Sequence, residues 1–220
     1  MSKMELNYGK DNLTQQPYQH YLKRYQETSV FTMSERTGIS FSEEESAFFV
    51  RFLGELYKVT HPEFTVIHQT ETTGIYILED SIQAKILLLR FFVDGDATTW
   101  SGKLLSYHDL PWGEVYYRQF QGRCILRLAR TYGNSLVIFK NIMEYMHGLQ
   151  KDYGDISYEF ELMSGLHLCF VLWEGDEEFA PSAQILFSDN FPAAFSAEDV
   201  AYVGDIVMDY MKKVGRRIES

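Results

Sequence analysis

The stretch from His167 to Phe187, HLCFVLWEGDEEFAPSAQILF, decides how we expect this chain to fold. Both ends of the stretch are strongly apolar, which is typical of central β-strands. The middle holds four carboxylates together with Gly175 and Pro181, and such residues favour turns. The stretch therefore predicts a β-hairpin, with strands at 167–173 and 183–187 joined by an acidic turn.

The residues around this hairpin predict further antiparallel strands. From Tyr158 to Leu162, apolar and acidic residues alternate, so one strand face is buried and the other is wet. Between residues 39 and 77 the pattern predicts a second group, a short meander that includes 75–77 and turns at Gly54, His61-Pro62 and Gly74. Two groups of antiparallel strands are thus expected.

In most of the remaining chain, apolar residues recur at the spacing of an α-helix. Ser81 and Ser196 are placed as N-caps, and Asp199 completes a capping box with Ser196. The expected helices are 17–38, 82–93, 114–132, 135–150 and one that begins at 196. This order favours an α+β fold, in which antiparallel strand groups pack with four to five helices in a single compact domain at 17–220 after a flexible N-terminus at 1–16. The alternative is two lobes that meet near 94–113.

Composition excludes several classes of protein. The 31 acidic residues outnumber the 20 basic ones, and the formal net charge of −11 disfavours nucleic acids and anionic membranes as partners. Two cysteines, Cys124 and Cys169, are too few for an iron–sulfur cluster, and both fall in apolar patterns. The histidine spacing predicts no structural zinc site. With no signal peptide and no apolar run long enough for a membrane span, we expect a cytoplasmic protein.

The acidic turn is the first candidate site. Like charges at Asp176, Glu177 and Glu178 can be neutralised by a hard cation, so Mg²⁺ or Ca²⁺ is the metal that this turn would hold. The same turn also has the composition of a solvated hairpin. Both interpretations stay open at this stage.

The long segment from 94 to 113 is the second candidate site, because long loops in compact domains often carry function. It contains the aromatic residues Trp100, Tyr107 and Trp112, the cation Lys103, and His108, whose neighbour Asp109 can raise an imidazole pKa. We expect this segment and the turn from Trp173 to Ser182 to line one surface, with Glu174 orienting a ligand. Arg123 and Arg127, part of a stripe with Arg118 and Arg130, are further ligand candidates, and the alternative is a solvated helix face.

One segment combines Ser101-Gly102-Lys103 with Ser106 and Leu110-Pro111, and a second combines Trp173 to Phe179 with Pro181-Ser182-Ala183 and Ile185 to Asp189. Together these two segments resemble a prokaryotic family known as domain of unknown function 3786. The likeness runs from about residue 18 to the last helix. The chain departs from the family pattern at Gln184, where the family has Asn, and at Ser188, which separates Phe187 from Asp189.

The resemblance implies a cytosolic protein of an anaerobic bacterium or archaeon, and some relatives carry iron–sulfur segments that this chain lacks. It implies a fold and two candidate surfaces, and no catalytic residue. Our leading hypothesis is therefore a non-enzymatic accessory protein, a monomer or homodimer, that binds a small molecule or a protein partner. The alternative is a metal-assisted hydrolase or lyase that uses the turn at 174–178.

Overall fold

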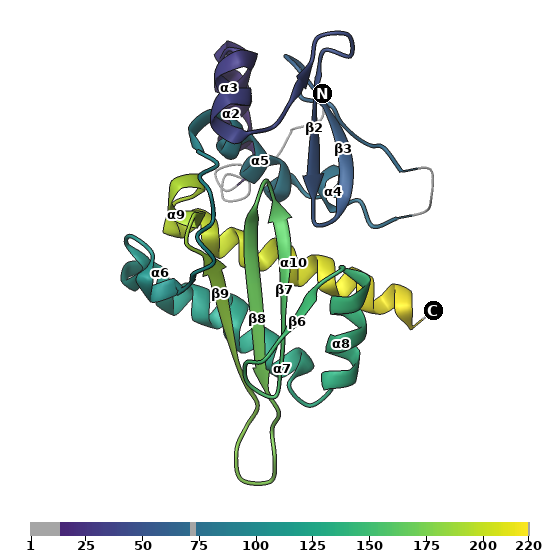
Figure 1. Cartoon of the computed structure of the whole chain (residues 1–220), viewed down its shortest axis with the longest axis vertical. Helices are drawn as coiled ribbons and strands as arrows, with labels where there is room; N and C mark the ends of the chain where they lie inside the picture. Colours follow the sequence, from purple (N-terminus) through teal and green to yellow (C-terminus); the bar gives the residue numbers. More distant parts are fainter. Residues whose placement is uncertain (1–13, 71–73, 220) are drawn as a thin grey trace, which may run out of the picture.

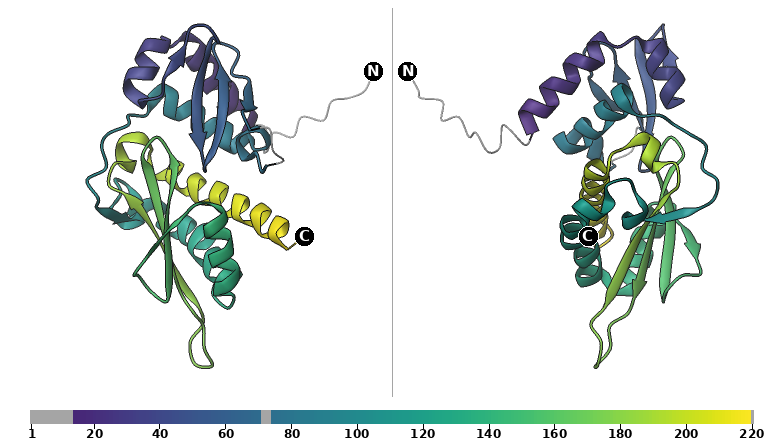
Figure 2. Two further views of the ribbon diagram at one scale, coloured as in Figure 1. Left: turned by 45° about the vertical axis from the view of Figure 1, so that its right-hand side comes forward. Right: turned by 90° about the vertical axis from the view of Figure 1, so that its left-hand side faces the viewer.

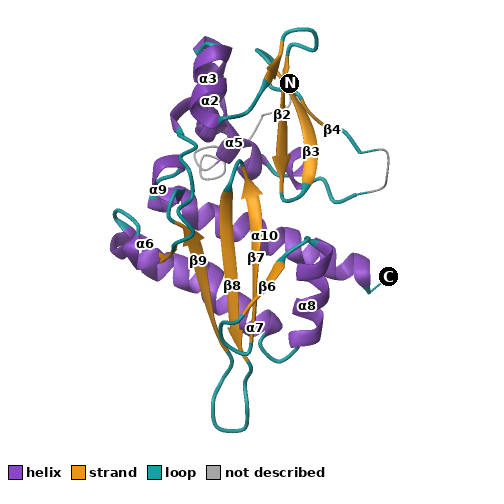
Figure 3. Cartoon of the chain, in the orientation of Figure 1, coloured by secondary structure: helices purple, strands orange, loops and turns teal. Residues whose placement is uncertain are grey.

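Two antiparallel sheets lie one above the other in the computed structural model, which describes residues 14–70 and 74–219 (Figure 1). Of the expected flexible N-terminus, residues 1–13 lie outside this part of the chain, and helix α2 begins at Gln16. Figure 3 shows that helices accompany both sheets, so strands and helices are mixed along the chain in the manner of an α+β fold.

The upper sheet is the expected meander, in the order β1-β2-β3-β4. Its strands are Phe41–Ser42, Ala47–Phe52, Glu55–Thr60 and Val66–His68. Gly54 turns β2 into β3 at a φ of 85°, a conformation that glycine adopts without steric cost. The strand expected at 75–77 was wrong: Ile77 instead opens a one-turn helix, α4 (Ile77–Asp80).

The helix expected at 17–38 is two helices, α2 (Gln16–Glu27) and α3 (Val30–Thr37). The break falls at Thr28 and Ser29, which are both extended, and the Thr28 hydroxyl donates to the carbonyl of Arg24. Gly38 ends α3 in the left-handed region, as expected. The helix after Ser81, α5 (Ile82–Asp94), is confirmed, and the Ser81 hydroxyl accepts from the Ala84 amide.

The lower sheet has the order β5-β9-β8-β7-β6. Its strands are Leu104–Ser106, Ser182–Ser188, Leu166–Trp173, Ile156–Met163 and Leu149–Lys151 in that order. The predicted hairpin is β8 and β9, paired from Leu168–Phe187 to Trp173–Ser182. Two expectations were wrong: 104–106 is a strand and not loop, and 149–151 is strand β6 and not the end of a helix. Both are three-residue strands, too short to show a period of their own.

Helices cover one face of the lower sheet (Figure 2). They comprise α6 (Gly113–Phe120), a π-helical turn η3 (Gln121–Ile125), α7 (Leu126–Tyr132), α8 (Leu136–Tyr145) and α10 (Ala197–Ile218). With the one-turn helices α4 and α9 (Phe191–Ala194), the described residues hold more helices than the four to five expected, since single turns have no periodic signature. None of the helices in the described ranges combines the length and the hydropathy of a membrane span.

Helix α10 and the turns between strands join the two sheets into one domain. Ser196 and Asp199 form the predicted capping box, and the apolar positions of α10 from Val200 to Val214 that follow helical spacing, Val203 and Ile206 among them, are buried. The amide of Leu53, in the β2–β3 turn, donates to the carbonyl of Leu162 in β7 at 2.8 Å. A single apolar core therefore runs through the molecule, and we describe it as one α+β domain.

Candidate functional site

A groove with a volume of about 340 Å³ lies between strand β9 and the helix formed by α6, η3 and α7. We call it the α7–β9 groove. Its strand wall is residues 181–185, its upper end is residues 106–108, and Trp173 stands at its lower end. The helix wall consists of Tyr117, Gln121, Ile125, Leu126 and Ala129. The groove thus brings together parts of both segments that the sequence marked as candidate sites.

The strand wall of this groove is an open sheet edge. Strand β5 pairs with β9 only at Leu186, Phe187 and Ser188 and then leaves the sheet as the short 3₁₀ helix η2 (Tyr107–Asp109). Within the described residues, β9 from Ser182 to Ile185 therefore has a strand neighbour on its β8 side alone. An unpaired strand edge is a template for another strand.

The register shows which main-chain groups face the groove. The Asp189 amide donates to the Lys103 carbonyl at 3.1 Å, so residue 189 faces the β5 side. Main-chain groups alternate in direction along an antiparallel strand, and the groups of 187, 185 and 183 therefore face the same side. Gln184, one residue away from Ala183, turns its amide toward β8. The amide and carbonyl of Ala183 are thus directed into the groove.

The upper end of the groove is fixed by stacked rings. The Tyr107 ring lies 4.0 Å from the Phe120 ring, centroid to centroid, and its hydroxyl donates to the Ala197 carbonyl at 2.6 Å. Burial raises the pKa of Tyr107, so it stays a neutral donor. The His108 ring lies 3.6 Å from the Tyr117 ring and 3.8 Å from a Glu114 carboxylate oxygen. These contacts hold the rings of Tyr107 and His108 in place.

The lower end is closed where the β8–β9 hairpin meets the end of α7. The Gly175 amide donates to the Gly133 carbonyl at 3.2 Å. A Cβ on Gly133 would stand only 2.3 Å from the Cβ of Pro181, so no larger residue fits there without displacing the hairpin. The close approach positions Pro181 and Trp173 against the helix wall.

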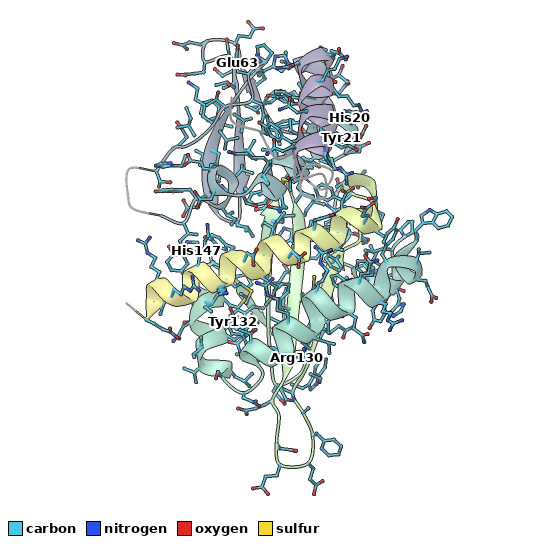
Figure 4. The ribbon with its side chains drawn as sticks, turned by 180° about the vertical axis from the view of Figure 1, so that it is seen from behind. His20, Tyr21, Glu63, Arg130, Tyr132 and His147 are labelled. Atoms are coloured by element: carbon cyan, nitrogen blue, oxygen red, sulfur yellow. The ribbon has the colours of Figure 1, made fainter. Side chains whose placement is uncertain are left out.

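The helix that forms this wall also carries two unpaired cations, which lie outside the groove lining. Arg118 and Arg130 are exposed and have no ion pair within the described residues. Figure 4 labels Arg130 on α7, at the end of the helix that lies nearer the hairpin. Arg123 forms an ion pair with Asp205, and Arg127 pairs with Asp209 at 2.5 Å, so these two ligand candidates bind α10 instead.

The acidic turn projects beyond the body of the molecule (Figure 1). Asp176 folds the turn back on itself, because its carboxylate accepts from the amides of Glu178 and Phe179 at 2.8 and 2.7 Å. The side chains of Glu177 and Glu178 are exposed. Across residues 14–70 and 74–219, no group of three or more His, Cys, Asp or Glu side chains is arranged to hold a metal ion.

The remaining candidates lie away from the groove. Trp100 donates its indole N–H to the Lys103 carbonyl and stacks on His167 at the opposite end of β8 from Trp173. His167 and Trp173 are six residues apart on β8, so they are separated by roughly 20 Å along the strand. Glu174 is exposed beyond the groove, its amide held by the Asp155 carboxylate. Trp112 lies in a separate cleft.

The buried titratable groups are structural. Burial raises the pKa of both Cys124 and Cys169 to about 12, so neither thiol is activated at neutral pH. Glu159 is buried in β7, where it binds Lys151 at 2.9 Å and lies 3.4 Å from a His167 ring nitrogen. Sequence reasoning missed this ion pair, because alternation alone assigned Glu159 to a wet strand face.

Sequence reasoning also missed the helix wall of the groove. Its residues follow ordinary helical spacing, and nothing in that spacing marks a surface that a strand edge will face. Pro181 and Gln184 lie in the predicted hairpin. The one sequence signal of an open edge there is Pro181, because proline is found at the beginnings of strands and on edge strands.

A family model described as "Domain of unknown function (DUF3786)" matches residues 30–210 of the chain. The match spans both sheets, helix α10 up to Tyr210, and every residue that lines the groove. No curated protein and no solved structure matches the chain.

Proposed function

We propose that this chain, which belongs to the DUF3786 family, is a partner-binding protein that takes up an extended peptide segment of another protein in the α7–β9 groove. The segment adds to β9 as an extra strand, in line with β5. Strand addition at an open sheet edge is a common mode of peptide recognition.

The observation that carries this proposal is the open edge of β9 from Ser182 to Ile185, where it faces the groove. Four strand residues span about 13 Å, enough for a bound segment of about four residues. The Ala183 amide and carbonyl supply main-chain hydrogen bonds without any change in the β8–β9 ladder. The groove lies between a strand and a helix and not between loops, which reduces the ordering cost of binding.

The walls of the groove indicate which segments bind. Every second side chain of an added strand points toward the helix wall. Ile125, Leu126 and Ala129 make that wall apolar, so we expect apolar residues at alternate positions of the partner. The unpaired cations Arg118 and Arg130 favour acidic residues at the other positions or at the ends.

The test begins with selection of short random peptides displayed on phage against the wild-type protein. A selected peptide is then synthesised and added to ¹⁵N-labelled protein, and amide exchange is followed by NMR. We expect the Ala183 amide to exchange fast in the free protein and slowly in the complex, while the Gln184 amide is slow in both. A bound peptide that leaves the Ala183 amide unprotected, or a selection that enriches no peptide, would overturn the proposal.

Charge reversal tests the preference for acidic segments. Arg130→Glu should weaken the binding of an acidic peptide by about 0.2–1 kcal/mol, the range measured for exposed charge pairs. Lys212→Glu on α10 makes the same change in net charge away from the groove and should leave the affinity unchanged. Equal losses in the two variants would show that only net charge matters.

The alternative function, a metal-assisted hydrolase or lyase at the acidic turn, receives less support from the geometry. Asp176 already accepts two amides, and the neighbouring carboxylates do not converge on one point. We expect millimolar Mg²⁺ or Ca²⁺ to leave the melting temperature of the protein unchanged. A rise that disappears in the combined variant Asp176→Asn, Glu177→Gln, Glu178→Gln would favour the alternative.

A further inference from the structure

A second cavity lies on the other side of α6 from the groove. It has a volume of about 750 Å³, within the range of small-molecule sites, and it opens where α2, α5, α6, α9 and the start of α10 meet. We call it the α10 cleft. Figure 4 labels Tyr21, one of its lining residues, on α2 close to the N-terminal end of α10.

One wall of the α10 cleft already holds a cation between an aromatic ring and a carboxylate. The Arg90 guanidinium lies 4.8 Å from the centroid of the Tyr21 ring and pairs with Asp199. Arg24 binds Asp94 through both carboxylate oxygens, at 2.8 and 2.6 Å. Of the three carboxylates that line the cleft, Asp94 and Asp199 are therefore neutralised by the protein itself.

The cleft lining also holds a carboxylate and an aromatic ring that the protein itself leaves without a cation, Glu198 and Trp112. Glu198 is exposed, lines the cleft and has no ion pair within the described residues. Trp112 lines the cleft with 79% of its surface exposed. A carboxylate and an indole face are the groups that bind ammonium and guanidinium ions in proteins.

Trp112 occupies this position at a conformational cost. Its φ is 64°, a left-handed conformation that costs a bulky residue of order 1 kcal/mol or more. The next residue must be glycine, because a Cβ on Gly113 would stand 1.9 Å from the Tyr107 carbonyl oxygen. The tight turn at 112–113 thus holds a large apolar side chain in solvent beside the cleft. This placement costs free energy twice, through the strained backbone and through the exposed apolar surface.

We propose that the α10 cleft binds a small organic cation, a molecule with an ammonium or guanidinium group on an apolar body. The cation lies between the Trp112 indole and the Glu198 carboxylate. The apolar body lies along Pro111, Val115 and Pro192, which line the same cavity. This site is independent of the α7–β9 groove, since the two cavities share no lining residue.

The test titrates the full chain with two cations, tyramine and agmatine, and with tyrosol, the neutral hydroxyl analogue of tyramine. Binding is measured by calorimetry, and the indole N–H resonance of Trp112 is followed by NMR. We expect at least one cation to bind and to shift that resonance, and tyrosol to bind far more weakly. Trp112→Leu and Glu198→Gln should each lower the affinity for the cation by a factor between about two and thirty.

Matched controls separate the cleft from general effects. Glu177→Gln removes the same charge at the acidic turn, and Phe31→Leu removes another exposed aromatic ring, on α3. Both should leave the affinity unchanged. Failure of both cations to bind, equal binding of tyrosol, or unchanged affinity in Trp112→Leu and Glu198→Gln would each overturn the proposal. Loss of peptide binding in the groove has no bearing on it.

Discussion

Replacing Ala183 with proline removes the main-chain hydrogen that β9 directs into the α7–β9 groove. The β8–β9 ladder keeps all its bonds, because the Ala183 amide faces away from β8 and proline is tolerated at strand edges where the N–H faces solvent. We therefore expect Ala183→Pro to fold with a melting temperature within about 2 °C of wild type, a shift that corresponds to at most about 0.5–1 kcal/mol in a chain of this size.

The effect on binding should be much larger than the effect on folding. A bound strand loses its hydrogen bond from Ala183, and one of its carbonyls is left buried without a donor. An unsatisfied group of this kind costs about 1–3 kcal/mol. Since about 1.4 kcal/mol is a factor of ten, the dissociation constant of a selected peptide should rise about fivefold to 150-fold.

Gln184→Pro is the matched control for this experiment, because it makes the same replacement one residue along the strand. The Gln184 amide faces β8, so proline there removes a bond of the central ladder and should lower the melting temperature by about 2–12 °C. Circular dichroism melts and calorimetry with one peptide measure both quantities. Unchanged peptide affinity in a folded Ala183→Pro variant would falsify the strand-addition proposal.

Three further outcomes follow from the packing and the electrostatics. Gly133→Ala should destabilise the protein and weaken peptide binding, because the new methyl group collides with the hairpin, whereas Gly122→Ala, in open space, should stabilise it by about 0.4–1 kcal/mol in the same thermal melts. Val203→Asp should unfold the protein, since its fully buried side chain on α10 would carry an uncompensated charge; a cooperative melt near the wild-type temperature would contradict this. The Ser101 hydroxyl and amide donate to the Asp189 carboxylate and hold the pKa of Asp189 below its usual value. The stability that these hydrogen bonds contribute is therefore present above pH about 4 and is lost as the pH falls through the lower pKa of the folded state. Ser101→Ala should move the Asp189 pKa upward in a carboxyl NMR titration, and an unchanged pKa would exclude the hydroxyl as its cause.

The sequence predicted the features that depend on neighbouring residues. The β8–β9 hairpin follows from two apolar runs around an acidic turn, and the capping box of Ser196 and Asp199 lies within four residues. The α+β class and the meander at 41–68 follow from period and order alone. Such signals are local, so a linear pattern contains them.

The errors concern elements whose conformation depends on a distant partner. Leu104–Ser106 and Leu149–Lys151 are strands because β9 and β7 supply their hydrogen bonds, and neither triplet has enough residues to show a period. The predicted single surface was also divided by packing: Tyr107 and His108 line one end of the groove and Trp173 the other, while Trp100 and Trp112 lie elsewhere.

The sequence by itself determined the class of fold, the central hairpin, the N-caps of α5 and α10 and the acidic balance of charge. Only the tertiary structure decided that β5 ends opposite Leu186, which leaves the edge of β9 open, and that α10 supplies the partners of Arg123 and Arg127. It also decided that Arg118, Arg130 and Glu198 have no ion pair within the described residues. The physical reason is that an edge, a groove or an unpaired charge is a property of neighbours in space, and such neighbours are distant in the chain: Arg123 and Arg127 each lie 82 residues from the aspartate that they bind.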